Sequence, residues 1–229
     1  MKLTITLIAV AILTAACGGT SQPVVVQAAS PDQELVAEAG IDEPSTFVTA
    51  PGSKVWFTID EMFRGAPKTV VGVNPKVAAE VVADIEDPGS VAMGPILIKS
   101  AFFDTEPGEE PSPLGDEIGW RDTAINRFIL DSSAYPDITF TPADVIDLTE
   151  ATQGQAVEVG GELTIRDITR TVVFTIMIDS FTDQRVEVSG WAEVLRQDYD
   201  LNIPRVAHVA EVADEFRLEF DLIFKAIEE

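Results

Sequence analysis

Alternation of apolar and charged residues near the C-terminus is the feature that most constrains the fold of this chain. In residues 214–226, DEFRLEFDLIFKA, mostly charged residues separate the apolar positions Phe216, Leu218, Phe220, Leu222 and Phe224. Successive side chains of a β-strand point to opposite faces, so this pattern predicts a strand with one apolar and one solvent-exposed face. The apolar face must therefore be covered by a second layer of side chains or by an apolar ligand.

Similar strand-like segments fill the chain from about residue 46, at 53–60, 69–74, 77–85, 91–103, 132–148, 155–165, 169–179 and 185–195. The short connections between them suit antiparallel hairpins and leave no room for crossover helices. One segment, RDTAINRFILD (121–131), has apolar residues at helical spacing and predicts a single short helix. About eight strands and one helix favour an all-β antiparallel barrel, because closure leaves no edge strand unpaired.

The interior of an eight-stranded barrel can be filled by side chains or can hold one small apolar ligand. Besides the C-terminal strand, alternation assigns these positions to the interior: Val55, Phe57, Ile59, Ile138, Phe140, Leu163, Ile165, Val172, Phe174, Ile176, Ile178, Val186, Val188 and Ala192. A packed core and a ligand-lined tunnel predict the same alternation, so both interpretations stand at this point.

The N-terminal residues have the pattern of a secretory signal. MKLTITLIAVAILTAAC has a basic Lys2, an apolar run over 3–13 and small residues before Cys17. It resembles a bacterial lipoprotein signal, in which the cysteine is lipidated and becomes the new N-terminus; an ordinary signal peptide with an incidental cysteine is the alternative. We expect a signal peptide over 1–16, lipidation at Cys17, a flexible tether over 17–45 and a barrel domain over 46–229. The protein would then be exported and anchored to the membrane, facing the periplasm or the cell exterior.

The charge and the residue types exclude several classes of function. A formal net charge of −24 argues against binding nucleic acid, which requires Lys and Arg against the phosphates. His208 is the only histidine, so no second histidine completes a base–nucleophile pair. The acidic segment EPGEEPSPLGDEIG (106–119) predicts a surface loop, and its carboxylates lack the spacing of an EF-hand. The sequence therefore predicts a protein that is not an enzyme and has no metal site and no cofactor.

Four segments, in this order, resemble the YceI-like family of lipid- and polyisoprenoid-binding proteins. They are RDTAINRFILD (121–131), SAYPDITFTPADV (133–145), GELTIRDITRTVVFTI (161–176) and EVLRQDYDLNIP (193–204). The resemblance covers about residues 46–227. Asp167 and Asp200 stand where the family usually has glycine, and Thr171 replaces a common proline.

The resemblance implies a lipocalin-like extended antiparallel barrel whose interior binds long isoprenoid chains, including quinone-type lipids. On this interpretation the lipid-binding residues are Val55, Phe57, Ile59, Phe140, Leu163, Phe174, Ile176, Val188, Phe216, Leu218, Phe220 and Phe224. The charged residues of the family-like segments are expected to form buried pairs that hold loops to the barrel, with an arginine contact to a ligand head group as the alternative. These residues are Arg121, Asp122, Arg196 and Asp198.

The expected function is binding, and transport or sequestration, of an isoprenoid or related lipid by a membrane-anchored protein outside the cytoplasm. The alternative is a non-catalytic interaction module of the cell envelope. In that case the barrel would be filled, and the acidic surface would bind a protein partner or cations.

Overall fold

The computed structural model describes residues 45–105, 117–142, 146–205 and 208–227. The predicted signal peptide, the lipidation site Cys17, nearly all of the tether and most of the acidic loop (106–116) lie outside these ranges.

Most of the described chain is β-strand, which confirms the predicted all-β class. The strands are β1 (Ser45–Thr49), β2 (Lys54–Phe63), β3 (Ala66–Asn74), β4 (Val77–Ala78), β5 (Glu80–Ala83), β6 (Val91–Met93), β7 (Ile96–Lys99), β8 (Asp137–Pro142), β9 (Val157–Ile165), β10 (Ile168–Phe181), β11 (Arg185–Leu195) and β12 (Val209–Ala226). The sheet has twelve strands rather than about eight, chiefly because residues 77–83 and 91–99 are each interrupted once.

Helical segments are short. The helix predicted over 121–131 forms as α2 (Glu117–Thr123), which continues as a π-helical segment η2 (Ala124–Ile129). The others are α3 (Thr149–Thr152) and the 3₁₀ segments η1 (Ser100–Phe102) and η3 (Arg196–Tyr199).

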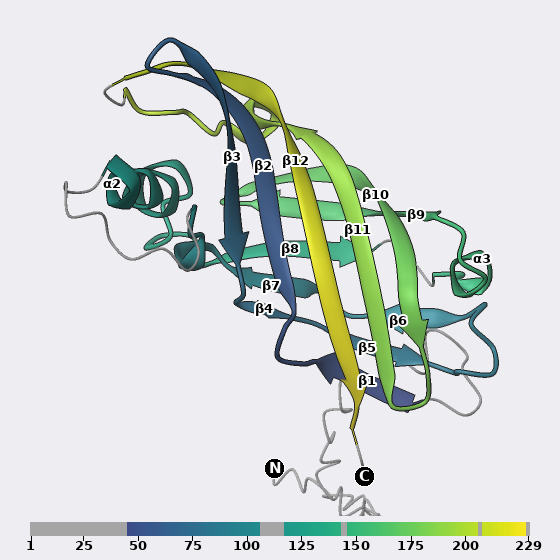
Figure 1. The fold of residues 1–229 in the computed structure, drawn as a ribbon. Coiled ribbons are helices and arrows are strands. Elements are labelled where there is room, and N and C mark those ends of the chain that lie inside the picture. The colour runs from purple at the N-terminus through teal and green to yellow at the C-terminus, as the bar shows by residue number, and fades with distance from the viewer. Residues whose placement is uncertain (1–44, 106–116, 143–145, 206–207, 228–229) are drawn as a thin grey trace, which may run out of the picture.

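The sheet curls so that its pairing returns to its starting strand. β12 pairs with β11 along one edge, and with β2 and then β1 along the other. β1 pairs with β5, and β5 and β4 are the two parts of the interrupted segment 77–83. β4 in turn pairs with β7, and the pairing runs on through β8, β9 and β10 to β11. The barrel is therefore closed at the end that contains β1. At the other end the β2–β3 hairpin extends away from β1, and α2 lies on the same side of the molecule (Figure 1).

Residues with positive φ shape three of the tight turns. Arg64 and Gly65 join β2 to β3 with φ of +51° and +79°, as a two-residue hairpin loop prefers. In the β9–β10 loop, Arg166 takes the left-handed conformation (φ +59°) in place of Asp167, where the family usually has glycine. Asp200, the second such position, does adopt a positive φ of +49° after η3, and aspartate tolerates this conformation better than most residues.

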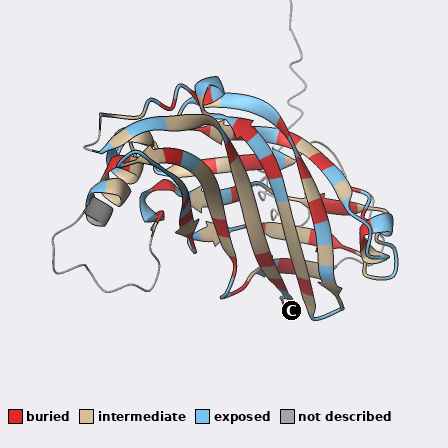
Figure 2. Ribbon diagram, turned by 45° about the horizontal axis from the view of Figure 1, so that its top comes forward, coloured by how far each residue is buried: buried red, intermediate tan, exposed pale blue. Residues whose placement is uncertain are grey.

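The apolar face of β12 points into the barrel, as the alternation predicts. Phe216, Leu222 and Phe224 are buried, whereas Leu218 and Phe220 are partly buried against the same core. Figure 2 shows how buried, intermediate and exposed positions are distributed along the strands that form the wall. What these side chains face is therefore the interior of the barrel.

Adjacent glycines of β9 provide a direct test of the packing against this wall. A Cβ at Gly161 would lie 2.5 Å from both the Phe140 ring and the Thr141 carbonyl oxygen, whereas one at Gly160 meets nothing within 4 Å. We expect Gly161→Ala to lower the free energy of unfolding by about 1–3 kcal/mol through overpacking. Gly160→Ala should be neutral or stabilising by up to about 1 kcal/mol. Urea unfolding of both variants checks this, and equal effects would contradict the packing described.

Tyr199, in η3, is fully buried, and its hydroxyl has no hydrogen-bond partner among the described residues. Burial raises the pKa of Tyr199 to about 12, a shift that Arg170 opposes and Asp198 reinforces.

This shift makes stability depend on pH in the alkaline range. The unfolded chain loses the phenolic proton near pH 10 while the folded chain keeps it, so the stabilisation is complete below pH 10 and is lost as the pH rises towards 12. The loss reaches about 2 kcal/mol at pH 11.5 by this linkage. We expect Tyr199→Phe to remove this pH-dependent part of the stability. The free energy of unfolding of the variant should therefore fall less between pH 9 and 11.5 than that of the unmodified chain. An identical drop in both proteins would show that the phenol is not shifted.

Candidate functional site: two apolar cavities

A cavity of about 540 Å³, here called the mouth cavity, lies at the open end of the barrel. One side is formed by the inner face of β2 and the first half of β12, and the other by α2, η2, residues 201–205 and His208. Its apolar wall includes Phe57, Ile59, Ile125, Phe128, Ile129 and Phe216. Because Trp120 and Phe128 line it and are also 64% and 60% exposed, this cavity is in contact with solvent.

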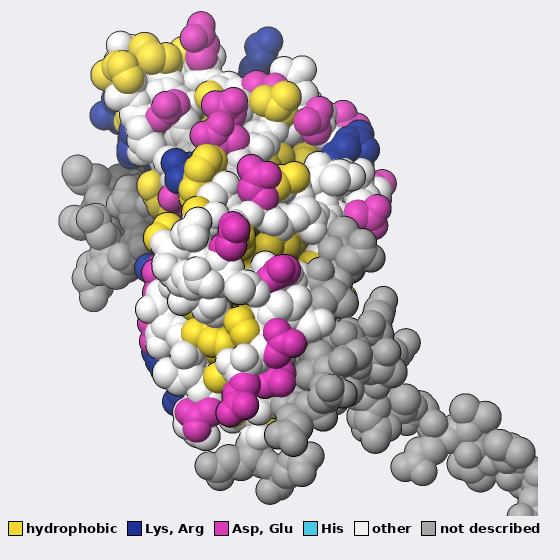
Figure 3. All heavy atoms as spheres, turned by 90° about the vertical axis from the view of Figure 1, so that its right-hand side faces the viewer, with side chains coloured by type: hydrophobic (Ala, Val, Ile, Leu, Met, Phe, Trp, Pro, Cys, Tyr) yellow, Lys and Arg dark blue, Asp and Glu magenta, His cyan; other side chains and the backbone are white. Residues whose placement is uncertain are grey.

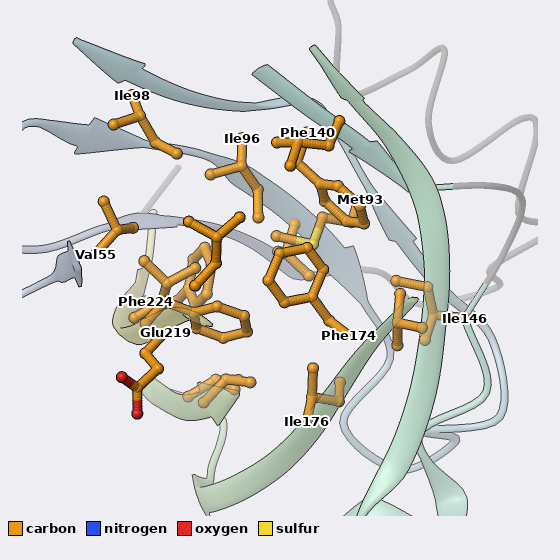
Figure 4. A pocket seen from close by; sticks show the side chains of 18 of the residues that line it. Val55, Met93, Ile96, Ile98, Phe140, Ile146, Phe174, Ile176, Glu219 and Phe224 are labelled. Carbon is orange, nitrogen blue, oxygen red and sulfur yellow. The ribbon is translucent and has the colours of Figure 1, made fainter. Parts of the chain in front are cut away.

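A second cavity of about 130 Å³, the inner cavity, lies deeper in the closed part of the barrel. Side chains from strands on all sides converge on it (Figure 4). Among the described residues, Glu219 is the one charged residue of its lining, and its carboxylate points away from the rings (Figure 4). That carboxylate accepts hydrogen bonds from Trp56 Nε1 at 2.8 Å and Thr58 Oγ1 at 2.9 Å. The space itself is therefore bounded by apolar groups.

Among the described residues, four line both cavities and lie at the boundary between them, here called the constriction: Phe103, Ile138, Ile165 and Leu218. Beyond the constriction, aromatic rings fill much of the barrel. The centroid of the Phe174 ring lies 4.9 Å from that of Phe140, with the rings edge to face, and 5.7 Å from that of Phe220. The interior thus combines the two arrangements that the sequence left open, since the inner half is largely packed and the outer half is hollow.

All twelve predicted lipid-binding residues line one of the cavities. The inner cavity is lined by Val55, Phe140, Leu163, Phe174, Ile176, Val188, Phe220 and Phe224, the mouth cavity by Phe57, Ile59 and Phe216, and both by Leu218. Val172, Ile178 and Ala192, also assigned to the interior, pack in the core without lining either cavity. That these residues contact a ligand stays a prediction.

The sequence did not identify the contribution of the helix to the mouth. Ala124, Ile125, Phe128 and Ile129 were recognised by their helical spacing, and all four line the mouth cavity. The spacing gives the helix an apolar side, but it does not say which part of the barrel that side meets. Trp120 also lines the cavity and carries no periodic signal of its own.

Buried charges at the mouth hold its elements together. Arg121 Nη2 lies 2.7 Å from Glu61 Oε1, and the two side chains are only 14% and 7% exposed. Arg196 donates to the carbonyl oxygen of Leu201 at 2.7 Å and lies 3.7 Å from Asp214. These contacts agree with the structural role expected of both arginines.

Of the two aspartates expected to take the same structural role, Asp122 has such a contact, whereas Asp198 is in none of the salt bridges of the described residues. Asp122 accepts hydrogen bonds from the Thr105 backbone N–H at 3.0 Å and the Thr105 hydroxyl at 2.7 Å, so it also fixes a loop. Asp198 lies in the first turn of η3, and none of the salt bridges found in the described residues includes it.

His208 is an exposed residue of the loop that borders the mouth, with a φ of +69°. Its carbonyl oxygen accepts a hydrogen bond from the Arg64 backbone N–H at 2.8 Å. Across the described ranges, His, Cys, Asp and Glu nowhere form a group of three that could hold a metal ion. In those ranges no helix has the length and apolar character needed to cross a membrane.

Solved structures share the fold at low sequence identity. A polyisoprenoid binding domain from Saccharophagus degradans superposes with a TM-score of 0.58 at 12% identity, covering 81% of this chain and 100% of that one. BcnA of Burkholderia cenocepacia gives 0.53 at 23% identity, with coverages of 75% and 95%. A YceI protein of Campylobacter jejuni gives 0.52 at 18% identity, with coverages of 69% and 85%. None of the curated proteins compared with the chain matches it.

The family comparison is more specific than these structural likenesses. The YceI-like domain matches residues 47–224, which run from within β1 to two residues before the end of β12. The chain therefore belongs to the YceI-like family.

Proposed function

We propose that this protein binds one long apolar chain of the isoprenoid class in the mouth and inner cavities and does not transform it chemically. The observation that carries the proposal is the mouth cavity of about 540 Å³, which is walled mainly by apolar side chains and shares four lining residues with a second apolar cavity. Its volume falls in the range of about 300–1,000 Å³ that is usual for ligand pockets. The name of the similar domain from Saccharophagus degradans, which describes polyisoprenoid binding, supports the choice of ligand class.

Burial of apolar surface supplies the affinity. Each methylene removed from water contributes about 0.8 kcal/mol, so several isoprene units offset the entropy lost on ordering a flexible chain. The apolar tail would occupy the mouth cavity and point towards the constriction. The polar end of the ligand would remain near the solvent-accessible rim, where Arg205 and His208 are exposed.

The proposal includes export and a membrane anchor at Cys17. The apolar N-terminal run followed by small residues and a lone cysteine supports it. More than one acyl chain is needed for stable anchoring. A tethered barrel near a bilayer could take up a poorly soluble chain from the membrane, sequester it or carry it to an acceptor.

The test is a binding titration of the full-length chain held in amphipol, with a quinone carrying four isoprene units as the probe. Trp120 lines the mouth cavity, so bound quinone should quench tryptophan fluorescence in a saturable way. Val212→Trp places a large ring in the mouth cavity and should weaken binding at least tenfold. Val173→Trp, at a 51% exposed position of β10, is the matched control and should bind like the unmodified chain. Quenching that does not saturate, or equal affinities of the two variants, would count against the proposal.

The second candidate is an interaction module that binds a partner through its acidic surface. Figure 3 supports it, since acidic side chains are spread over the face shown and basic ones are fewer. The ring cluster around Phe174 also fills much of the inner barrel, as this candidate requires. The titration separates the two candidates, because an interaction module with no lipid ligand gives no saturable quenching.

A further inference from the structure

Phe57 of β2 faces the interior between a glycine and a leucine. It is paired in register with Gly72 of β3 on one side and with Leu218 of β12 on the other. A Cβ at Gly72 would lie 2.2 Å from Cε1 and 2.5 Å from Cζ of the Phe57 ring. The ring therefore lies directly over Gly72, in space that any other residue at position 72 would occupy.

This position of the ring keeps it against the sheet and beside the constriction. The ring centroid lies 5.6 Å from that of Phe103, with an angle of 53° between the planes. Phe103 and Leu218 are two of the four residues that separate the mouth cavity from the inner cavity. Because Leu218 lies on the side of Phe57 opposite to Gly72, a ring displaced from Gly72 moves towards Leu218 and Phe103.

Two other glycines are covered by rings, but Gly72 differs from them in one respect. The atoms closest to a Cβ at Gly161 and at Gly190 include backbone carbonyl oxygens, of Thr141 at 2.5 Å and Thr175 at 2.9 Å. The three closest atoms at Gly72 all belong to the Phe57 ring. A methyl group at position 72 therefore acts on the ring without pressing on a neighbouring strand.

On the basis of the proposed function, we propose that Gly72 determines the length of chain the barrel accepts. By seating the Phe57 ring against the sheet, it keeps open the passage through which the end of a long apolar chain reaches the inner cavity. The accepted ligand is a chain with an apolar terminus, because the described residues that line the inner cavity present no polar group to it that could pair with a hydroxyl or charge. Shorter chains fill the mouth cavity only, where Phe57 is one of many wall residues, so they depend less on Gly72.

The experiment compares quinones with two and with nine isoprene units, each titrated against the full-length chain in amphipol. Gly72→Ala should weaken binding of the nine-unit quinone at least tenfold, which corresponds to losing the burial of about two methylenes. Binding of the two-unit quinone should stay within about twofold, since the mouth cavity of about 540 Å³ leaves a short chain room away from the Phe57 ring. Gly72→Ala combined with Phe57→Leu should restore the affinity for the nine-unit quinone, because the smaller side chain no longer collides with the new methyl group.

Two further variants keep the result interpretable. Gly160→Ala adds the same methyl group where nothing lies within 4 Å, and should leave both affinities unchanged. Phe103→Trp narrows the passage from the opposite side with Gly72 intact, and should cause the same selective loss even if Gly72→Ala fails to fold.

The outcomes separate this inference from the proposed function. If the unmodified chain binds neither quinone, the proposed function fails and this inference fails with it. If it binds both, and Gly72→Ala and Phe103→Trp leave the nine-unit affinity unchanged or lower both affinities equally, length selection by Gly72 is overturned while lipid binding stands.

Discussion

Arg121→Ala should lower the free energy of unfolding by about 3–5 kcal/mol, because it leaves the Glu61 carboxylate buried without its partner. Glu61 lies on the inner face of β2 with a side chain only 7% exposed, and Arg121 joins α2 to it at 2.7 Å. The pair therefore determines where the helix sits over the mouth cavity. Its loss should also weaken binding of the four-unit quinone, since α2 and η2 supply one wall of that cavity.

Urea unfolding measures the loss of stability in Arg121→Ala, and two comparison variants show that it comes from the unpaired Glu61 carboxylate. Glu61→Leu combined with Arg121→Met removes both charges and should be close to the unmodified chain in stability, as replaced buried pairs often are. Asp221→Ala breaks the exposed pair with Lys54, whose side chains are 46% and 45% exposed, and should cost less than about 1 kcal/mol. A loss at Arg121→Ala no larger than at Asp221→Ala would contradict the burial of the pair.

Phe174→Ala should also cost about 3–5 kcal/mol, the range for removing a buried phenylalanine from a packed core. Its ring contacts both Phe140 and Phe220, so the deletion opens space at the centre of the inner cavity. In a barrel that binds apolar chains, this new space should be usable by the ligand. We therefore expect the nine-unit quinone to recover part of the lost stability by binding preferentially to the folded variant.

Thermal unfolding with and without the quinone tests this expectation. The quinone should raise the melting temperature of Phe174→Ala more than that of the unmodified chain. Phe128→Ala is a suitable comparison for the stability effect, because Phe128 is 60% exposed and its truncation should change stability by about 0.5 kcal/mol or less. A melting temperature of Phe174→Ala that does not respond to the quinone would mean that the inner half of the barrel is only core.

Strand alternation predicts the direction of side chains well in this protein. Val55, Phe57 and Ile59 were assigned to the interior by their spacing, and all three line a cavity. The same spacing continues to Glu61, which also faces inwards. Extending the alternation by two residues would have marked this glutamate as a buried acid in need of a partner.

No local sequence pattern predicts that the interior is divided into two cavities. This division depends on Phe103, which follows the 3₁₀ segment η1, and on the packing of the Phe57 ring against Gly72 of the next strand. Such contacts join residues far apart in the sequence, and alternation describes one strand at a time. Register shifts in β12, between Val209 and Val212 and again before Phe216, likewise end the simple alternation where the strand enters the mouth.

Native mass spectrometry of the full-length chain purified from its own host, followed by lipid extraction, tests the central claim most directly. The account predicts one apolar chain molecule per protein, built of several isoprene units and absent from Val212→Trp. An unmodified chain that carries no such molecule, or a Val212→Trp variant that carries it to the same extent, would contradict the account.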